Sequence, residues 1–288
     1  MAIVITGATG HLGRLVITHL LVRGVPADDI IAIARDKEKA ADLTARGIHV
    51  HLADYDHPET FTDAFHPGDR VLLISAPVPG NRAAQHRTVI DAAEKADVAH
   101  LAYTSIFGSP TADFLLAREH QATEQSILAS GLPHTFLRNN WYTEMYLTDL
   151  PGLLDRGVLI SNAPEGSRVA SAPRSDYAEA AAVVLTTEGH QAKSYELGGD
   201  TAWSYEELTE ELTRQSGRKV VHTSLPAAEH KQILVNVGLP EPFAEALADA
   251  DEAIGRGALS ATPGDLSTLI GRPTTPIPSV IATALTGA

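Results

Sequence analysis

Near its start the chain has a short apolar run followed by three glycines spaced three residues apart, Gly7, Gly10 and Gly13. A strand, a glycine turn of this kind and a helix form the arrangement that receives a pyrophosphate. Gly7 permits a tight turn, Gly10 lets a phosphate approach the backbone, and Gly13 lets the helix pack closely on the strand. The free N–H groups at the helix start attract the anion. The alternative is a tight strand-to-helix turn without a ligand.

Short apolar runs alternate with amphipathic segments through the first half of the chain. Some runs, such as residues 71–74, are apolar on both faces, which is typical of buried parallel strands. The alternation predicts an α/β fold with a doubly wound parallel sheet. The expected strands are residues 2–5, 30–34, 49–53, 71–75, 100–104 and 135–137, and the expected helices are residues 12–21, 37–46, 59–65, 81–96 and 114–130.

The regular alternation ends near Asn139, which predicts two parts. We expect an NAD(P)-binding Rossmann domain over residues 1–139 and a smaller, mostly helical substrate-binding lobe over residues 140–288. The lobe is expected to cover the carboxyl ends of the strands, where ligands of such sheets bind. A helix within residues 176–190 is expected to pack back on the first domain.

Three local signals place elements in the second half of the chain. Ser175-Asp176 can cap a helix over residues 178–185, residues 195–197 have the pattern of a strand, and Ser204 with Glu207 forms a capping box for a helix over residues 206–215.

Composition excludes several classes of function. The 22 basic and 36 acidic residues give a net charge of −14, which repels nucleic acid and anionic membranes. The absence of cysteine excludes disulfides and thiolate chemistry. No signal-peptide pattern and no membrane-spanning apolar stretch is found, so we expect a cytoplasmic protein without membrane insertion. His49 and His51 follow strand alternation, and no metal site is expected.

The end of the second strand distinguishes the two nicotinamide dinucleotides. An NAD site usually has an acidic residue there. This chain has Arg35, with Lys39 one turn later, and an arginine can pair with a 2′-phosphate and lie against adenine. NADPH is therefore the expected cofactor and NADH the alternative, because Asp36 could repel that phosphate. A solvated Arg35–Asp36 ion pair is the competing interpretation.

Other dinucleotide contacts are expected at the ends of the first, third and fourth strands. Asp54 is placed to reach the adenine amine or, alternatively, to cap the next helix. Small residues after the fourth strand would let the backbone lie along the ribose. The residues expected at these places are Gly7, Ala8, Thr9, Gly10, His11, Leu12, Gly13, Asp54, Ser75, Ala76 and Pro77.

The segment after the sixth strand is expected at the substrate end of the cofactor. It consists of Asn139, Asn140, Trp141, Tyr142, Thr143 and Glu144. Its amides and backbone can contact the nicotinamide, and Trp141 and Tyr142 can stack on a flat substrate that Phe107 covers from the other side. The candidate catalytic residues are Asn139, Tyr142 and His120, the last as a proton shuttle. The alternatives are a core seam for the aromatic residues and a surface or capping role for His120.

These residues resemble the NmrA-like branch of the short-chain dehydrogenase superfamily, and within it the bacterial NADPH:quinone oxidoreductases. The resemblance covers nearly the whole chain. It rests on the segments Gly7–Gly13, Ala34-Arg35, Ala53-Asp54-Tyr55, Leu73-Ile74-Ser75, Tyr103-Thr104-Ser105, Leu137–Glu144, Asp176-Tyr177-Ala178 and Tyr195–Asp200. It implies hydride transfer from NADPH to a quinone in a bilobal fold, with the site between the lobes. Neither a flavin nor a metal is expected, and a homodimer is compatible with it. Family members often carry Asn where this chain has Asp36.

One departure from ordinary short-chain dehydrogenases bears on the substrate. Those enzymes protonate a carbonyl with a Tyr whose partner Lys lies four residues on, but none of the 7 tyrosines here has Lys at that position. The helix after Ser105 has His120 and Glu124 instead. A simple ketone needs proton delivery in the transition state. A quinone yields a much less basic hydroquinone anion that can take its proton from water.

Two other functions compete with quinone reduction. One is a redox sensor of NmrA type, which would bind the dinucleotide without chemistry. The other is a reductase or isomerase for a different conjugated carbonyl, which would need a well-placed acid that the sequence does not identify.

Overall fold

The computed structural model describes residues 1–76 and 80–287. Contacts within the chain divide it into two compact units. The first unit consists of Met1–Ser109, Glu119–Asn139 and Arg174–Tyr195, and the second of Pro110–Arg118, Asn140–Pro173 and Glu196–Ala288.

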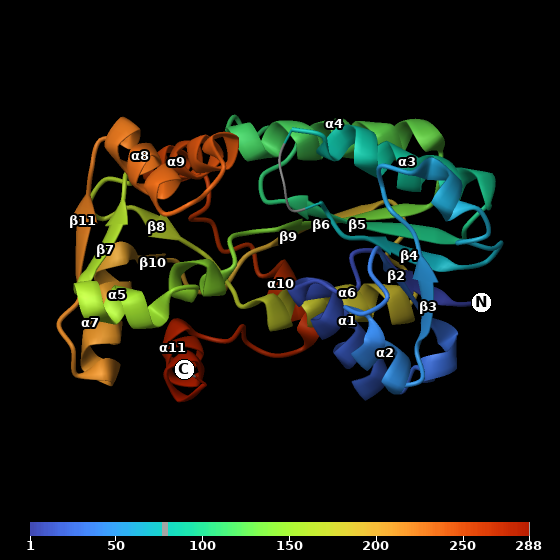
Figure 1. Ribbon diagram of the computed structural model, residues 1–288, viewed down its shortest axis with the longest axis horizontal. Coiled ribbons are helices and arrows are strands. Elements are labelled where there is room, and N and C mark those ends of the chain that lie inside the picture. The colour runs from blue at the N-terminus through green and yellow to red at the C-terminus, as the bar shows by residue number, and fades with distance from the viewer. Residues whose placement is uncertain (77–79, 288) are drawn as a thin grey trace. The chain divides into compact units, whose positions relative to one another are not determined.

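A seven-stranded sheet in the order β3-β2-β1-β4-β5-β6-β9 organises the first unit (Figure 1). Neighbours from β3 to β6 in this order are parallel. The strands are β1 Ile3–Ile5, β2 Ile30–Ala34, β3 His49–Leu52, β4 Arg70–Leu73, β5 His100–Ile106, β6 His134–Asn139 and β9 Lys193–Leu197. Ile3 of β1 lies opposite both Ile30 and Arg70. The strand order reverses between β1 and β4, so ligands are expected beyond the carboxyl ends of these two strands.

Helices cover both faces of this sheet, with α3 and α4 on one face and α1 and α6 on the other (Figure 1). Their bounds are α1 His11–Val22, α3 Arg82–Lys95, α4 Leu115–Ser130 and α6 Arg174–Thr186, with the short α2 Ala41–Ala45 and the 3-10 turns η1 Ala27–Asp29 and η2 Pro58–Phe61. The α/β fold with a doubly wound sheet is thus confirmed. A buried core beneath α3 includes Val4, Val71, Leu73, Val89, Ile90, Leu101, Tyr103, Ile127 and Phe136.

The second unit combines short helices with two small sheets. β10 pairs with β8 in antiparallel fashion, and β11 pairs with β7 in parallel. Its elements are η3 Thr143–Leu147, α5 Leu150–Arg156, β7 Val158–Ser161, β8 Arg168–Val169, β10 Trp203–Ser204, α7 Tyr205–Ser216, β11 Val221–Ser224, α8 Ala227–Asn236, α9 Glu241–Gly255, α10 Asp265–Ile270 and α11 Ile277–Thr286. Ser204 and Glu207 form the expected capping box at α7. The small sheets escaped sequence analysis because strands of two to four residues show little periodicity.

Three expected element boundaries are wrong, each for a local reason. The helix expected over residues 37–46 is reduced to α2, because the Asp36 side chain binds the N–H groups that follow it and holds a turn. The helix expected over residues 59–65 is only the 3-10 turn η2, since Asp63 has a positive φ of 58°. Helix α6 starts at Arg174, so Ser175-Asp176 lies in its first turn and does not precede it.

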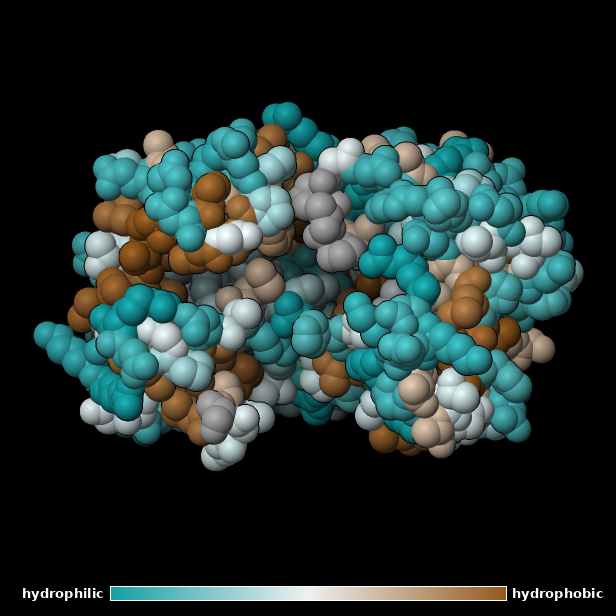
Figure 2. All heavy atoms as spheres, viewed as in Figure 1, coloured by the Kyte–Doolittle hydropathy of each residue, from teal (hydrophilic) through white to brown (hydrophobic). Residues whose placement is uncertain are grey.

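The outer surface of α3 and α4 is mainly hydrophilic (Figure 2). Polar residues buried beneath these helices are therefore distinct from this hydrophilic exterior. Within residues 1–76 and 80–287, no helix has both the length and the apolar character needed to cross a bilayer.

Candidate functional site

The turn between β1 and α1 is shaped by its glycines. Gly7 has a φ of +59°, in the left-handed region that favours glycine. A Cβ on Gly13 would lie 2.5 Å from the Gly7 carbonyl oxygen and 2.7 Å from the Ala8 Cα. Gly10 is the N-cap of α1 and has no side chain to bind the first N–H groups of the helix. The turn therefore presents uncapped backbone donors at the start of a helix, which is a ready-made anion site.

The remaining residues of this turn have distinct environments. Ala8 is buried, and its N–H donates to the Ile33 carbonyl at 3.2 Å, which joins the turn to β2. Thr9 is half-buried, His11 is exposed in the first turn of α1, and Leu12 packs inward. Of these, His11 has its side chain in solvent at the end of the helix where an anion would bind.

The turn after β2 resolves the relation between Arg35 and Asp36. One carboxylate oxygen of Asp36 accepts the backbone N–H groups of Glu38 at 2.8 Å and Lys39 at 3.2 Å. Arg35 is exposed and has no ion-pair partner within the described ranges. The Asp36 carboxylate thus binds N–H groups of its own turn, and the exposed guanidinium of Arg35 can contact a ligand.

Arg14, which sequence analysis did not single out, ties the two turns together. Its Nε donates to the Thr9 carbonyl at 3.1 Å, and its Nη2 donates to the Lys39 carbonyl at 2.6 Å. It also forms an ion pair with Asp42. These partners become neighbours only in the folded chain, so no sequence pattern points to this role.

Tyr55 connects the loop after β3 to the switch point of the sheet. Its hydroxyl donates to Thr6 Oγ1 at 2.6 Å, and the same Thr6 oxygen accepts the Ile74 N–H at 3.0 Å. Burial raises the pKa of Tyr55, so its phenol is a neutral donor. Asp54 is half-buried and accepts the Asp56 N–H at 3.2 Å. Asp54 does not cap η2, whose N-cap is His57.

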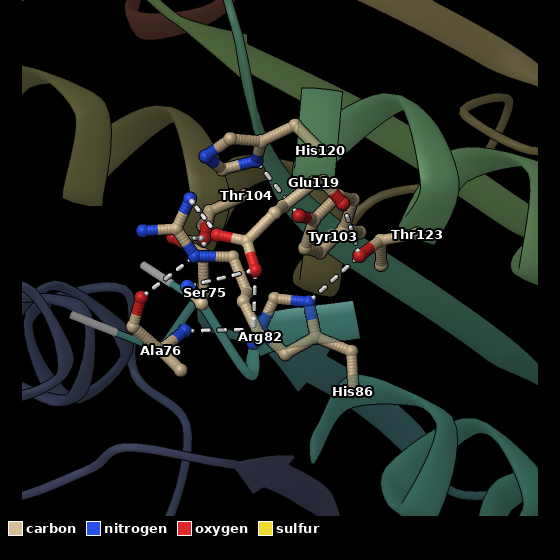
Figure 3. Close-up of polar contacts among 10 residues, drawn as sticks. Ser75, Ala76, Arg82, His86, Tyr103, Thr104, Glu119, His120 and Thr123 are labelled. Carbon is tan, nitrogen blue, oxygen red and sulfur yellow. Dashed lines mark hydrogen bonds and ion pairs between the residues drawn. The ribbon is translucent and has the colours of Figure 1, made fainter. Parts of the chain in front are cut away.

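The backbone after β4 is held by side chains from two elements, β5 and α3 (Figure 3). The Ser75 N–H donates to Thr104 Oγ1 at 2.9 Å. The Ala76 N–H donates to His86 Nε2 at 2.9 Å, and its carbonyl accepts from Arg82 Nε at 2.9 Å. Pro77, the next expected contact, lies outside the described residues.

His120 lies in the same buried cluster, on α4. Its Nδ1 lies 2.7 Å from the hydroxyl of Tyr103, which stands on β5 (Figure 3). Burial, and then the nearby Arg82 guanidinium and His86 imidazole, which oppose a second positive charge, hold the pKa of His120 well below its usual range. His120 is therefore a neutral imidazole in the folded protein, and it is neither a surface nor a capping residue.

Glu124 stands one turn further along α4 and faces different partners. Its Oε1 accepts from Ser105 Oγ at 2.6 Å and from Arg138 Nε at 3.0 Å, and its Oε2 accepts from Arg138 Nη2 at 2.8 Å. This bidentate pair joins α4 to the end of β6. The carboxylate that stands in the region of the missing dyad is thus fully engaged in a structural ion pair.

Asn139 and Phe107 lie together at the sheet edge of the first unit. Asn139 is the last residue of β6 and is buried, and its carbonyl accepts the Phe107 N–H at 3.0 Å. Phe107 is itself buried. Both residues are therefore rigidly placed by the strand ends.

The segment from Asn140 to Glu144 belongs to the second unit. The side chain of Asn140 is buried, donates to the Leu259 carbonyl at 3.1 Å and accepts the Trp141 N–H at 2.7 Å, so its amide is occupied by its own chain. Thr143 is buried and lies 2.7 Å from Ser171 Oγ. In contrast, Trp141, Tyr142 and Glu144 are half-buried. Two of the three, the aromatic residues, thus keep part of their surface for a ligand.

A Ser–His–Glu series in the second unit has the interatomic distances of a hydrolytic triad, but its serine is not accessible to a substrate. Ser161 Oγ lies 2.8 Å from His222 Nε2, and His222 Nδ1 lies 2.9 Å from a carboxylate oxygen of Glu206. Ser161 is only 2% exposed, its Oγ accepts the Ala163 N–H at 3.2 Å, and the ring of His222 stacks on Tyr205. A nucleophilic serine must reach its substrate, so this series is structural.

Comparison with known proteins places this geometry in a family. Residues 7–188 match the family described as NAD(P)H-binding. Quinone oxidoreductase 2 of Escherichia coli strain K12 is 46% identical over 273 residues, which cover 95% of each chain.

Two solved structures share the fold over nearly their full length. An NADPH-dependent quinone oxidoreductase from Escherichia coli, complexed with NADPH, aligns with a TM-score of 0.93 and 44% identity over 98% of this chain and 99% of that one. The Citrobacter sp. triphenylmethane reductase complexed with NADP(H) aligns with a TM-score of 0.92 and 42% identity over 98% and 100% of the two chains. Both relatives hold the same dinucleotide and differ in the acceptor that their names give.

Proposed function

Because the chain belongs to the NAD(P)H-binding family, we propose that it is an NADPH:quinone oxidoreductase that transfers a hydride from NADPH to a quinone. The observation that carries the proposal is the glycine turn at the switch point, which offers uncapped helix donors beside an arginine whose acidic neighbour is engaged elsewhere. The similarity to a bacterial quinone oxidoreductase over nearly the whole chain supports the choice of acceptor. The absence of a Tyr–Lys dyad is consistent with an acceptor that needs little acid catalysis.

The residues present fit a phosphorylated dinucleotide. Any side chain at Gly13 would collide with the turn, and Gly7 adopts a conformation that other residues avoid. Arg35 and Lys39 can meet the 2′-phosphate, because the Asp36 carboxylate is turned toward backbone N–H groups. When bound, NADPH supplies the hydride. In this proposal the turn residues 7–13, Arg35, Asp54, Ser75 and Ala76 hold its adenosine and pyrophosphate parts.

At the reacting end, the half-buried Trp141 and Tyr142 supply flat apolar surfaces for a quinone ring. Asn139 and the backbone of residues 140–144 are proposed to orient the nicotinamide. His120 is neutral, so its role is limited to hydrogen bonding, and the proton for the hydroquinone oxygen comes from water.

The proposal includes an organisation for the whole chain. We assign dinucleotide binding to residues 1–139 with the helix in 176–190, and substrate binding to residues 140–288. A cytoplasmic location is compatible with a chain that has no disulfides, since disulfides do not persist in a reducing compartment. A homodimer is compatible with this proposal, and sedimentation of the purified protein tests it.

Steady-state oxidation of NADPH with a panel of benzoquinones and naphthoquinones tests this function. We expect saturable turnover with at least one quinone and formation of one hydroquinone for each NADPH consumed. Turnover that stays at background across the panel contradicts the enzyme assignment. Tight binding of NADP⁺ without turnover, with a protein partner recovered in a pull-down, would instead identify the redox sensor.

A further inference from the structure

Both backbone polar groups of Ala76, in the segment that follows β4, are bonded by side chains. Its N–H and its carbonyl are bound by His86 and Arg82, which lie one turn apart on α3 (Figure 3). On the other side, one carboxylate oxygen of Glu119 on α4 accepts the N–H groups of Gly80 at 3.0 Å and of Arg82 at 3.2 Å. Two residues of α3 thus hold the backbone of Ala76, and Glu119 of α4 holds the start of α3 from which they project.

The hydrogen bonds run in one direction and define the state of His86. The Ala76 N–H can only donate, so Nε2 of His86 is the acceptor and carries no proton. Nδ1 then carries the hydrogen and donates to Thr123 Oγ1 at 2.9 Å. Thr123 in turn donates to the Glu119 carbonyl at 2.8 Å. This series of hydrogen bonds can form only if His86 is neutral, which agrees with the full burial of its side chain.

This segment lies directly beside the glycine turn. A Cβ on Gly7 would lie 3.5 Å from the Cβ of Ile74, and the Ile74 N–H donates to Thr6 at the end of β1. Ser75 and Ala76 therefore continue the chain at the switch point, where a dinucleotide held by the glycine turn has to pass.

Burying Arg82 and His86 is costly unless their polar atoms are used. Each uses one ring or guanidinium nitrogen on the main chain of Ala76, and Arg82 Nη1 also lies 3.9 Å from a carboxylate oxygen of Glu119. An apolar contact would have supported the helix packing at a lower cost.

We propose that Arg82, His86 and Glu119 are positioning residues, which hold Ser75–Ala76 in the conformation that the dinucleotide requires. The inference rests on the proposed function only in taking NADPH as the ligand. It assigns no chemistry to these residues, because Arg82 and His86 act through the backbone of Ala76 and Glu119 acts through Arg82. Their loss raises the Kd and the KM for NADPH and leaves the quinone step nearly unchanged.

The test compares His86→Leu, His86→Gln and Glu119→Gln with the matched control Arg87→Gln. Arg87 is exposed on the same helix and pairs only with Asp91 among the described residues. Calorimetry measures the Kd of NADP⁺, thermal unfolding gives the Tm, and steady-state kinetics separate the two KM values and kcat. Binding of NADP⁺ needs no acceptor, so this readout decides the inference even where no quinone is turned over.

We expect His86→Leu to raise the Kd of NADP⁺ about tenfold or more, since small misplacements of a binding segment have large effects. The KM for NADPH should rise in parallel, with the KM for quinone and kcat within about twofold of wild type. His86→Gln should recover part of the affinity, because an amide oxygen can accept the Ala76 N–H. Glu119→Gln should weaken binding by a smaller factor, and Arg87→Gln should not change it.

A merely structural role predicts a different pattern. In that case the Tm falls in His86→Leu or Glu119→Gln while the Kd of NADP⁺ stays at the wild-type value, and the inference is overturned. If His86→Leu does not fold, His86→Gln and Glu119→Gln decide the matter. Unchanged NADP⁺ affinity in both of these variants also contradicts the proposal.

Discussion

Two neighbouring stretches at the carboxyl edge of the same sheet are built in opposite ways. The glycine turn after β1 owes its shape to missing side chains, since any Cβ at Gly13 would strike the backbone. The segment after β4 owes its shape to buried polar side chains that hold the backbone of Ala76. The glycine turn leaves backbone N–H groups available to an anion, whereas in the segment after β4 the Ala76 N–H is already bonded by His86. The comparison indicates that a ligand-binding sheet edge needs both available backbone N–H groups and neighbouring segments that are held rigidly.

The largest effect is expected where a buried charge loses its partner. Replacing Glu124 by Leu removes the carboxylate that the Arg138 guanidinium on β6 binds at 2.8 Å, and breaking this buried pair should lower the free energy of unfolding by about 3–5 kcal/mol. Urea denaturation measures this loss, with Glu94→Leu on the exposed side of α3 as the control. A loss below about 1 kcal/mol would show that side-chain pairs at this edge matter less than its backbone turns.

The glycine turn is tested by the smallest possible side chain. Gly13→Ala should weaken NADP⁺ binding by about 10–100-fold and cost about 1–3 kcal/mol of stability, because the new Cβ must displace backbone atoms of Gly7 and Ala8. Gly10→Ala should cost less stability, since its Cβ would lie 3.2 Å from the Gly7 oxygen. Equal stability losses in the two variants would contradict the close-packing role of Gly13.

Arg35 tests which dinucleotide the open edge prefers. Arg35→Ala should weaken NADPH binding by about 1–3 kcal/mol and leave NADH binding almost unchanged, given the usual strength of charge-assisted hydrogen bonds. Titration of both cofactors measures the difference, and Lys95→Ala at the far end of α3 controls for the loss of one positive charge. If NADPH and NADH lose the same affinity, Arg35 does not contact the 2′-phosphate.

The smallest effect expected is a dependence of stability on pH. Burial, and next the charge of Arg82, lowers the pKa of His86 to about 3, against 6.5 in the unfolded chain. The unfolded state therefore binds more protons between these values, and stability falls as pH drops from about 6.5 toward 3, by up to about 1.4 kcal/mol for each pH unit. His100 and His120, whose pKa values are also lowered, contribute in the same direction.

Urea denaturation between pH 7 and pH 5 measures this slope. His86→Gln should show a shallower slope than wild type, because it removes one of the groups that titrate only in the unfolded chain. The groups that face His86 include Arg82, Thr123, Tyr55, Tyr103 and His120. In the folded protein the tyrosines have raised pKa values and His120 has a pKa well below its usual range, so none of these groups changes charge between pH 5 and pH 7. An identical slope in the variant would mean that His86 takes up its proton over the same pH range in the folded protein as in the unfolded chain, against the hydrogen bonds assigned to it.

The sheet could be predicted well because its strands are short apolar runs separated by turn residues. Each expected strand of the sheet is found, with ends that differ by a residue or two. The expected helices failed where a single side chain or backbone angle overrides periodicity, as at Asp36 and Asp63. Such local competition depends on hydrogen bonds that a hydrophobic pattern does not record.

The sequence by itself determined the α/β class, the glycine turn and the arginine at the end of β2, because these depend on neighbours within a few residues. Only the tertiary structure decided that His120 is neutral and that the backbone of Ala76 is held by His86 and Arg82. Those results come from burial and from contacts with other elements of the fold, which no local pattern contains. The available N–H groups of the glycine turn follow from the local sequence, whereas the rigidity of the segment after β4 comes from packing between elements.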